Sequence, residues 1–227
     1  MENLLNKMTN AEFFEKNGYV KIENFIGQDV ATLLYSYVMY EAKRLEFLES
    51  NYLIDKNKID SDLWGEFGDK QSPDFCKYGD FLMDTLLDCS LKKVEEYTGK
   101  KLVSTYTYHR LYTTDSELKI HKDRPSCEIS TTLCLGYNNQ NLKDQSWNWP
   151  MYVSKEETNG KPVHMNPGDM IIYRGCELYH WREPFPGLNH AQVFLHYNEK
   201  DGEYNNINDG RPMLGLPKDL RKYYEDK

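Results

Sequence analysis

The chain has 227 residues and a formal net charge of −8 at pH 7, and 14% of its residues are aromatic. This length suits one domain over residues 1–227 with a sizeable core, and the aromatic content indicates a folded globule rather than a disordered chain. The acidic balance argues against a nucleic-acid partner, because binding a polyphosphate backbone requires clustered Lys and Arg. No apolar run approaches the about 18 residues of a membrane span and no signal-peptide pattern opens the chain, so we expect a cytoplasmic protein without membrane partners.

The first hundred residues have the pattern of helices that buttress a sheet. Thr9 and Glu12 fit a capping box and Gly18 fits a helix stop. Later apolar residues recur with the spacing of amphipathic helices, and Asp80 can cap the second of these. The predicted elements are a helix over 10–17, a strand over 19–23, a helix over 29–50 with Leu33 on its apolar face, and a helix over 80–99 with Leu82 on its apolar face.

Residues 51–79 show no sustained period and contain several breakers, so they are predicted to form a long loop. Loops of this length in a compact domain are usually functional or loosely ordered. The segment is therefore a candidate lid over a substrate, and Trp64 is its candidate substrate-binding residue.

From Leu102 the composition changes to Thr, Val and Tyr, which favour strands. Short predicted strands separated by turns continue to about residue 200, which favours a barrel or jelly roll. The fold class is therefore mainly β with flanking helices, with 101–200 as the core and 201–227 as a C-terminal wrapping segment that has a short helix from about Lys218.

Two imidazoles and one carboxylate form the candidate metal site. His121 and Asp123 lie two positions apart, so an extended backbone directs both to one side. With His180 they supply the ligand set of a facial Fe(II) triad, which leaves three coordination positions open. A His-x-Asp pair alone is a weak signal, and its surroundings strengthen the prediction.

Those surroundings resemble the 2-oxoglutarate and Fe(II)-dependent dioxygenases, in particular the compact prolyl-hydroxylase-like branch. The segments that carry the resemblance are 106–112, 118–125, 127–137, 167–169, 172–184 and 193–197. The resemblance implies a double-stranded β-helix, iron held by His121, Asp123 and His180, and oxidative decarboxylation of 2-oxoglutarate by O2 to succinate and CO2. It also implies hydroxylation of an unactivated C–H bond, with desaturation or ring closure as other outcomes.

The family holds the distal carboxylate of 2-oxoglutarate with a basic residue about ten positions after the second histidine, and often with a tyrosine. Here residues 188–192 contain neither Arg nor Lys. A buried carboxylate still needs a strong donor. Arg182 is the first candidate, followed by Arg174, Arg110, His190 and Gln192. Tyr112 is the first candidate tyrosine, with Tyr108 and Tyr106 as alternatives, although each of these tyrosines can also serve only in packing.

The expected substrate is a small molecule, an amino acid or a peptide side chain. Arg124, Glu128 and Arg110 are the other candidate substrate-binding residues, and Arg124 and Glu128 can instead brace the loop that carries the metal ligands. Two alternatives stay open. A cupin-like metal dioxygenase would use the same triad without 2-oxoglutarate, and a binding barrel would have no catalytic activity.

Overall fold

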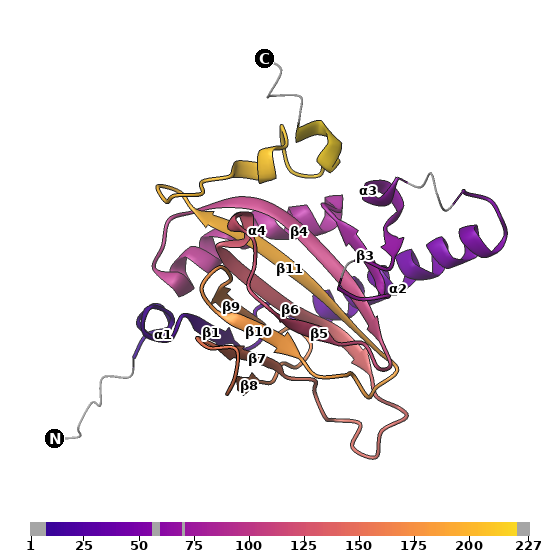
Figure 1. Cartoon of the computed structure of the whole chain (residues 1–227), viewed down its shortest axis with the longest axis horizontal. Coiled ribbons are helices and arrows are strands. Elements are labelled where there is room, and N and C mark those ends of the chain that lie inside the picture. Colours follow the sequence, from indigo (N-terminus) through magenta and orange to yellow (C-terminus); the bar gives the residue numbers. More distant parts are fainter. Residues whose placement is uncertain (1–7, 56–59, 70, 222–227) are drawn as a thin grey trace.

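Two antiparallel sheets face each other in the computed structural model, which describes residues 8–55, 60–69 and 71–221 (Figure 1). The larger sheet has the order β1 (Tyr19–Ile22), β9 (Met170–Arg174), β6 (Ile129–Asn138), β11 (Asn189–Glu199), β4 (Leu102–Thr113), β3 (Phe75–Tyr78) and β2 (Glu66–Phe67). The smaller sheet has the order β5 (Leu118–His121), β10 (Tyr179–Arg182), β7 (Met151–Ser154) and β8 (Lys161–Val163). This jelly-roll arrangement confirms the predicted fold class.

The period-two alternation of the strands divides the larger sheet into two chemically different faces. On β11, Val193 and Leu195 belong to the core cluster that includes the helices, and the neighbouring residues Gln192, Phe194 and His196 point to the opposite face. That opposite face is directed at the smaller sheet. The largest apolar cluster therefore lies between the larger sheet and the helices, whereas the space between the two sheets holds polar side chains together with two smaller apolar clusters.

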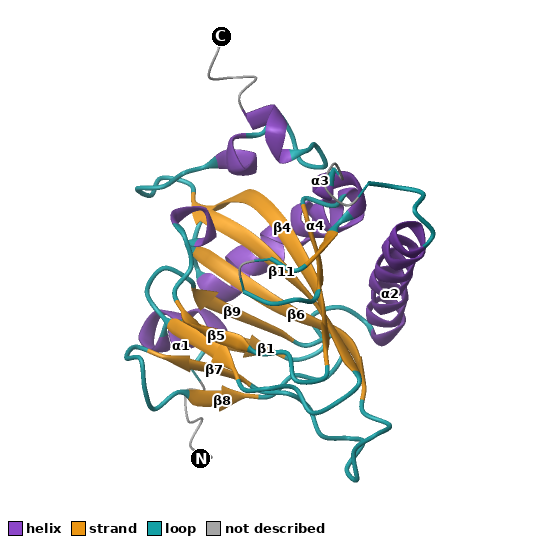
Figure 2. Cartoon of the chain, turned by 45° about the vertical axis from the view of Figure 1, so that its right-hand side comes forward, coloured by secondary structure: helices purple, strands orange, loops and turns teal. Residues whose placement is uncertain are grey.

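Two long helices, α2 (Gln28–Ser50) and α4 (Phe81–Thr98), cover the outer face of the larger sheet (Figure 2). Their ends match the prediction, since Asp80 caps α4 and Gly99 ends it in a left-handed conformation. The predicted apolar faces are confirmed in part. Leu34, Val38 and Leu45 of α2 and Val94 of α4 are buried, whereas Leu33 and Leu82 are exposed. The first helix, α1 (Asn10–Asn17), has the predicted capping box.

The prediction of a loop over 51–79 is wrong in part. This segment contains a short helix, α3 (Ser61–Trp64), and the strands β2 and β3, and β3 pairs with β4 inside the larger sheet. Lys77 interrupts the apolar pattern of β3, but its ammonium group is buried and lies 2.7 Å from both Glu41 and Asp80. One of these two partners, Glu41 on α2, is remote in sequence, so no local pattern indicates that a lysine can be buried in this strand. Residues 56–59 and 70 lie outside the described part of the chain.

After β11 the chain crosses the end of the larger sheet through the turns η2 (Ile207–Gly210) and η3 (Lys218–Arg221) (Figure 1). The predicted helix from Lys218 is limited to η3 within the described residues. Arg211 anchors this C-terminal segment, because its buried guanidinium lies 2.9 Å from the buried carboxylate of Asp84 on α4. Among the described helices, none is both long and apolar enough to cross a membrane.

Candidate active site

The predicted triad residues converge at one edge of the interior between the sheets. The pairing of β5 with β10 places His121 directly opposite His180. Asp123 follows the end of β5, where its backbone N–H donates to the Gly175 carbonyl. Asp123 Oδ1 lies 3.6 Å from His121 Nε2 and 3.4 Å from His180 Nε2. One ligand atom from each residue therefore lies within 4.8 Å of the others.

Hydrogen bonds behind the triad orient each ligand. The Nδ1 atoms of His121 and His180 lie 2.7 and 3.1 Å from the carbonyls of Lys119 and Leu178, which favours a proton on Nδ1 and a free lone pair on Nε2. Ser130 Oγ donates to Asp123 Oδ2 at 2.6 Å, so Oδ1 stays directed at the imidazoles. Burial alone would favour a protonated Asp123, but the two histidines hold its pKa well below the ordinary value.

The triad opens onto a cavity of about 470 Å³ between the sheets. Its polar wall is formed by inward-facing residues of β4, among them Tyr108, Arg110 and Tyr112. Phe194 and Met151 contribute apolar surface. The volume suits a small molecule or one side chain of a larger substrate.

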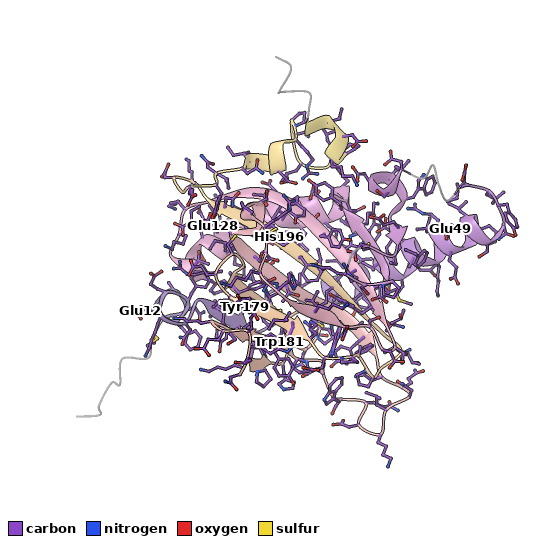
Figure 3. All side chains as sticks on the ribbon, in the orientation of Figure 1. Glu12, Glu49, Glu128, Tyr179, Trp181 and His196 are labelled. Atoms are coloured by element: carbon purple, nitrogen blue, oxygen red, sulfur yellow. The ribbon has the colours of Figure 1, made fainter. Side chains whose placement is uncertain are left out.

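Strand β10 carries a second inward-facing residue beside the triad. Arg182 follows His180 by two positions and is likewise buried. Tyr179 and Trp181 alternate with them (Figure 3), and Trp181 stacks on Tyr152 on the other face of the smaller sheet. The same alternation that directs His180 into the barrel therefore directs Arg182 there as well.

Arg182 and three other buried side chains have polar atoms without a hydrogen-bond partner among the described residues. These atoms are Arg182 Nη2, Tyr112 Oη, Gln192 Nε2 and His190 Nδ1. Arg182 Nη1 donates to the Trp149 carbonyl at 2.6 Å. Burial lowers the pKa of Arg182 to about 10. Burial, together with the positive charge of Arg182, lowers the pKa of His190 well below its ordinary value. The Arg182 cluster, defined as these four residues, is thus a buried group of donors with a neutral imidazole.

A second arginine lies on β4, on the side of the cavity that Asp69 lines. Arg110 is 2% exposed and its Nη2 donates to Asp69 Oδ2. Tyr108 Oη donates to the same carboxylate oxygen at 2.8 Å. Arg110 Nε and Nη1 have no partner within the part of the chain that the structure describes. Burial opposes ionisation of Asp69, but Arg110 and Tyr108 hold its pKa below the ordinary value.

Solved structures with a similar fold include prolyl hydroxylases and other 2-oxoglutarate-dependent enzymes. A prolyl-4-hydroxylase from Pseudomonas putida gives a TM-score of 0.57 at 12% identity, over 83% of this chain and 96% of that chain. The non-heme, α-ketoglutarate-dependent carbocyclase SnoK from nogalamycin biosynthesis gives 0.58 at 16% identity, over 95% and 93%. A viral collagen prolyl hydroxylase from Paramecium bursaria Chlorella virus 1, in complex with 2-oxoglutarate, gives 0.51 at 10% identity, over 81% and 97%. The chain has the fold of the 2-oxoglutarate and Fe(II)-dependent oxygenases.

No protein-family model and no curated protein matches the sequence. The predicted resemblance to this oxygenase superfamily, and to its prolyl hydroxylases, is confirmed at the level of the fold. Within this oxygenase fold the predicted residues Tyr108, Arg110, Tyr112 and the triad all line one cavity.

Among the residues predicted to bind the co-substrate or the substrate, Arg182, His190 and Gln192 are buried but are not part of the cavity lining, and three others lie away from the cavity altogether. Arg174 pairs with Glu15 at 2.7 Å and Glu177 at 3.0 Å on the protein surface. Trp64 packs against the guanidinium of Arg44 on the outer helix. Glu15 and Arg44 are remote in sequence from Arg174 and Trp64, so a local sequence pattern does not reveal these two contacts.

The third, Glu128, braces the end of β11, where it accepts a hydrogen bond from the Glu199 backbone N–H at 2.8 Å. Arg124 does line the cavity, but its guanidinium forms a two-pronged ion pair with Asp209 at 3.0 and 2.9 Å. Arg124 and Glu128 thus hold the ligand-bearing loop against neighbouring segments, which is the second of the two roles predicted for them.

Several cavity residues were not predicted as site residues. Asp69 and Gln71 come from the supposed loop, and nothing in their local sequence indicates a ligand. His196 also lines the cavity, and its Nδ1 lies 3.0 Å from Oγ of Ser130, the residue opposite it on β6. The alternation of β6 and β11 would have indicated this pair once the two strands were known to be neighbours.

Proposed function

We propose that this chain is an Fe(II)- and 2-oxoglutarate-dependent oxygenase. The observation that carries the proposal is the combination of a His-Asp-His triad with the unpaired, buried donors of the Arg182 cluster in one barrel. When bound, iron and 2-oxoglutarate would supply the oxidising chemistry, in which O2 converts 2-oxoglutarate to succinate and CO2 and the substrate is oxidised. The chain itself binds, orients and shields these groups.

His121, Asp123 and His180 would hold the iron. Their Nε2 atoms and Oδ1 point at one another, and no fourth His, Cys, Asp or Glu joins the group among the described residues. Such a set leaves coordination positions for a bidentate co-substrate and O2. Ser130 keeps the second oxygen of Asp123 occupied, so this carboxylate presents a single oxygen to the metal.

Arg182 would bind the distal carboxylate of 2-oxoglutarate, assisted by Tyr112 and Gln192. No carboxylate pairs with Arg182 in the described part of the chain, and burying an unpaired charge is costly. A bound carboxylate would accept hydrogen bonds from Arg182 Nη2, Tyr112 Oη and Gln192 Nε2, which otherwise lack partners.

In the sequence, the absence of an Arg or Lys about ten residues after His180 favoured the alternative of a cupin-like dioxygenase that does not use 2-oxoglutarate. Position 190 holds a histidine that burial keeps neutral, and Arg182 supplies a cation from the neighbouring sheet instead. With Arg182 available as the cation, the lack of an Arg or Lys at 188–192 does not favour a barrel that works without 2-oxoglutarate.

The role of Arg182 can be tested by the affinity of the anaerobic, Fe(II)-loaded protein for 2-oxoglutarate. We expect Arg182→Met to weaken 2-oxoglutarate binding at least about 100-fold while Fe(II) still binds, because a charge-assisted pair is lost. Arg174→Met is the matched control, since Arg174 lies on the surface in ion pairs of its own, and it should bind 2-oxoglutarate normally. Equal affinities in wild type and Arg182→Met would rule out this anchor.

We further propose that the substrate is a small molecule, an amino acid or a peptide side chain and that the reaction is C–H hydroxylation. The cavity volume supports a substrate group of this size. The reaction is tested by succinate formation under air with substrate libraries, analysed by mass spectrometry for products heavier by one oxygen atom. Products that lose two hydrogen atoms without gaining oxygen would instead indicate desaturation or cyclisation.

A further inference from the structure

Helix α2 is apolar on two sides, and only one of them is covered. Residues such as Leu34 and Val38 are buried against the larger sheet. On another side of the helix, Leu33, Tyr40 and Phe47 are 66, 73 and 60% exposed. Figure 2 shows α2 at the edge of the molecule, with no other helix or strand of the described chain on its outer side. A helix with a second apolar side is expected to have a second partner.

The exposed residues follow the spacing by which one helix packs against another. Successive positions differ alternately by three and four, so the residues form one line along the helix. We call this line the α2 stripe, and its members are Val30, Leu33, Tyr37, Tyr40, Arg44 and Phe47. All except the half-buried Tyr37 are exposed, and all except Arg44 are apolar or aromatic. The spacing indicates a helix as the partner, because it lets these side chains interdigitate with those of a second helix.

We propose that the α2 stripe binds the α2 stripe of a second copy of this chain, with the two helices antiparallel. Two-fold dimers are the commonest protein assemblies, and in them the same surface of each copy meets itself. This inference is independent of the proposed oxygenase function. In this arrangement the facing residues of the two copies are Tyr37 with Tyr40, Leu33 with Arg44, and Val30 with Phe47.

The charges along α2 are complementary to those of an antiparallel copy. Asp29 lies in the first turn of α2, and the cations Lys43 and Arg44 lie in its C-terminal half. A parallel pair would place each of these charges beside the same charge of the other copy, which is unfavourable. In the antiparallel pair, Arg44 lies opposite Leu33, one helical turn or about 6 Å along the axis from Asp29 of the other copy. Opposite charges therefore approach each other across the contact.

The apolar area of the stripe suits a reversible dimer. A fully buried Tyr or Phe side chain buries about 150–250 Å², and Leu33, Tyr40 and Phe47 are each more than half exposed. The stripe therefore offers several hundred Å² per copy, which is more than isolated surface apolar residues provide. Two such surfaces reach the lower end of specific interfaces, so we expect association that depends on protein concentration.

The test is sedimentation velocity of the full chain over about 1–200 µM, a range that detects micromolar affinities. We expect wild type to show a monomer–dimer equilibrium. Leu33→Glu combined with Tyr40→Glu should weaken dimerisation at least about 100-fold, because it places charges in the apolar contact. Leu82→Glu is the matched control, since Leu82 is an exposed apolar residue of α4 outside the stripe, and it should dimerise as wild type does.

Disulfide trapping tests the orientation of the two helices. Proteins with Leu33→Cys and with Arg44→Cys, each also carrying Cys89→Ser to remove an exposed native thiol, are mixed and oxidised. We expect a disulfide between positions 33 and 44, identified by peptide mass spectrometry, because only facing residues come within bonding distance. A disulfide that joins position 33 of both copies instead would contradict the antiparallel arrangement.

Two further results would overturn the inference. The first is a wild type that stays monomeric over the whole concentration range, and the second is a dimer that persists in the double variant. If the monomer instead binds vesicles of anionic phospholipid and the double variant does not, the stripe is a membrane-contact surface and not a dimer contact.

Discussion

Ser130 shows how one hydroxyl group can orient a candidate metal ligand. It bridges Asp123 and His196, and it leaves only Oδ1 of Asp123 facing the two imidazoles. We expect Ser130→Ala to weaken Fe(II) binding about 10- to 100-fold, because the carboxylate loses the hydrogen bond that orients it. Competition with a chelator of known affinity measures this change.

Ser104 provides a matched control for that substitution. It is also a buried strand serine, but its hydroxyl has no hydrogen-bond partner among the described residues. Ser104→Ala should leave Fe(II) affinity unchanged. If the two variants bind iron equally well, Ser130 does not position Asp123.

Residues of the site were predictable where chemistry and alternation were both visible in the sequence. His121, Asp123 and His180 stood out by ligand type and spacing, and the buried position of Arg182 followed from its place two positions after His180 on the same strand. Glu128 and Arg174 have equally suitable chemistry, but their actual partners, Glu199 and Glu15, are remote or lie on other elements. Such pairings depend on tertiary structure, so local sequence did not separate them from true cavity residues.

At the scale of elements, a buried ionic network joins α2, β3 and α4. Asp80 accepts hydrogen bonds from Lys77 Nζ at 2.7 Å and Tyr37 Oη at 2.8 Å, and it also caps α4. Burial opposes ionisation of Asp80, but Lys77, His109 and Tyr37 hold its pKa below the ordinary value of 3.8. The ionised network therefore stabilises the fold above that pH, and this stabilisation is lost as the pH falls through the lower pKa of the folded state.

Asp80→Asn isolates the charge, because Asn caps a helix about as well as Asp. We expect the variant to be less stable than wild type by about 2 kcal/mol at neutral pH, with the difference shrinking as the pH falls toward about 3. Urea unfolding across this pH range measures the difference. A gap that stays constant with pH would show that the charge of Asp80 contributes nothing.

At the scale of the whole molecule, the C-terminal segment is tied to the barrel by buried charges. Arg211 binds Asp84 of α4 and also donates to the Thr105 carbonyl on β4. Arg211→Met would leave the carboxylate of Asp84 buried without its cation, so we expect a loss of about 3 kcal/mol in the free energy of unfolding. Chemical denaturation measures this loss.

The control is Arg44→Met, which removes a half-exposed guanidinium at 3.6 Å from Glu41. It should cost less than about 1 kcal/mol. Similar losses in the two variants would mean that the Arg211 ion pair does not hold the C-terminal segment in place.

The fold class was predictable because short strands, turn residues and period-two alternation are local properties. The strand order was not, because the pairing of β11 with both β4 and β6 joins segments separated by more than fifty residues. The strand β3 was missed for the related reason that Lys77 is neutralised by Glu41 on α2. Local pattern thus predicted the architecture, and tertiary partners determined which polar residues enter the cavity.

The central claim is that the triad and the Arg182 cluster together bind iron and 2-oxoglutarate. Its most direct test is anaerobic titration of the Fe(II)-loaded protein with 2-oxoglutarate, followed by visible absorption. We predict a weak metal-to-ligand charge-transfer band in wild type that is absent in His180→Ala. Iron binding without any such band would contradict the claim. It would favour the alternative of a cupin-like metal dioxygenase that does not use 2-oxoglutarate.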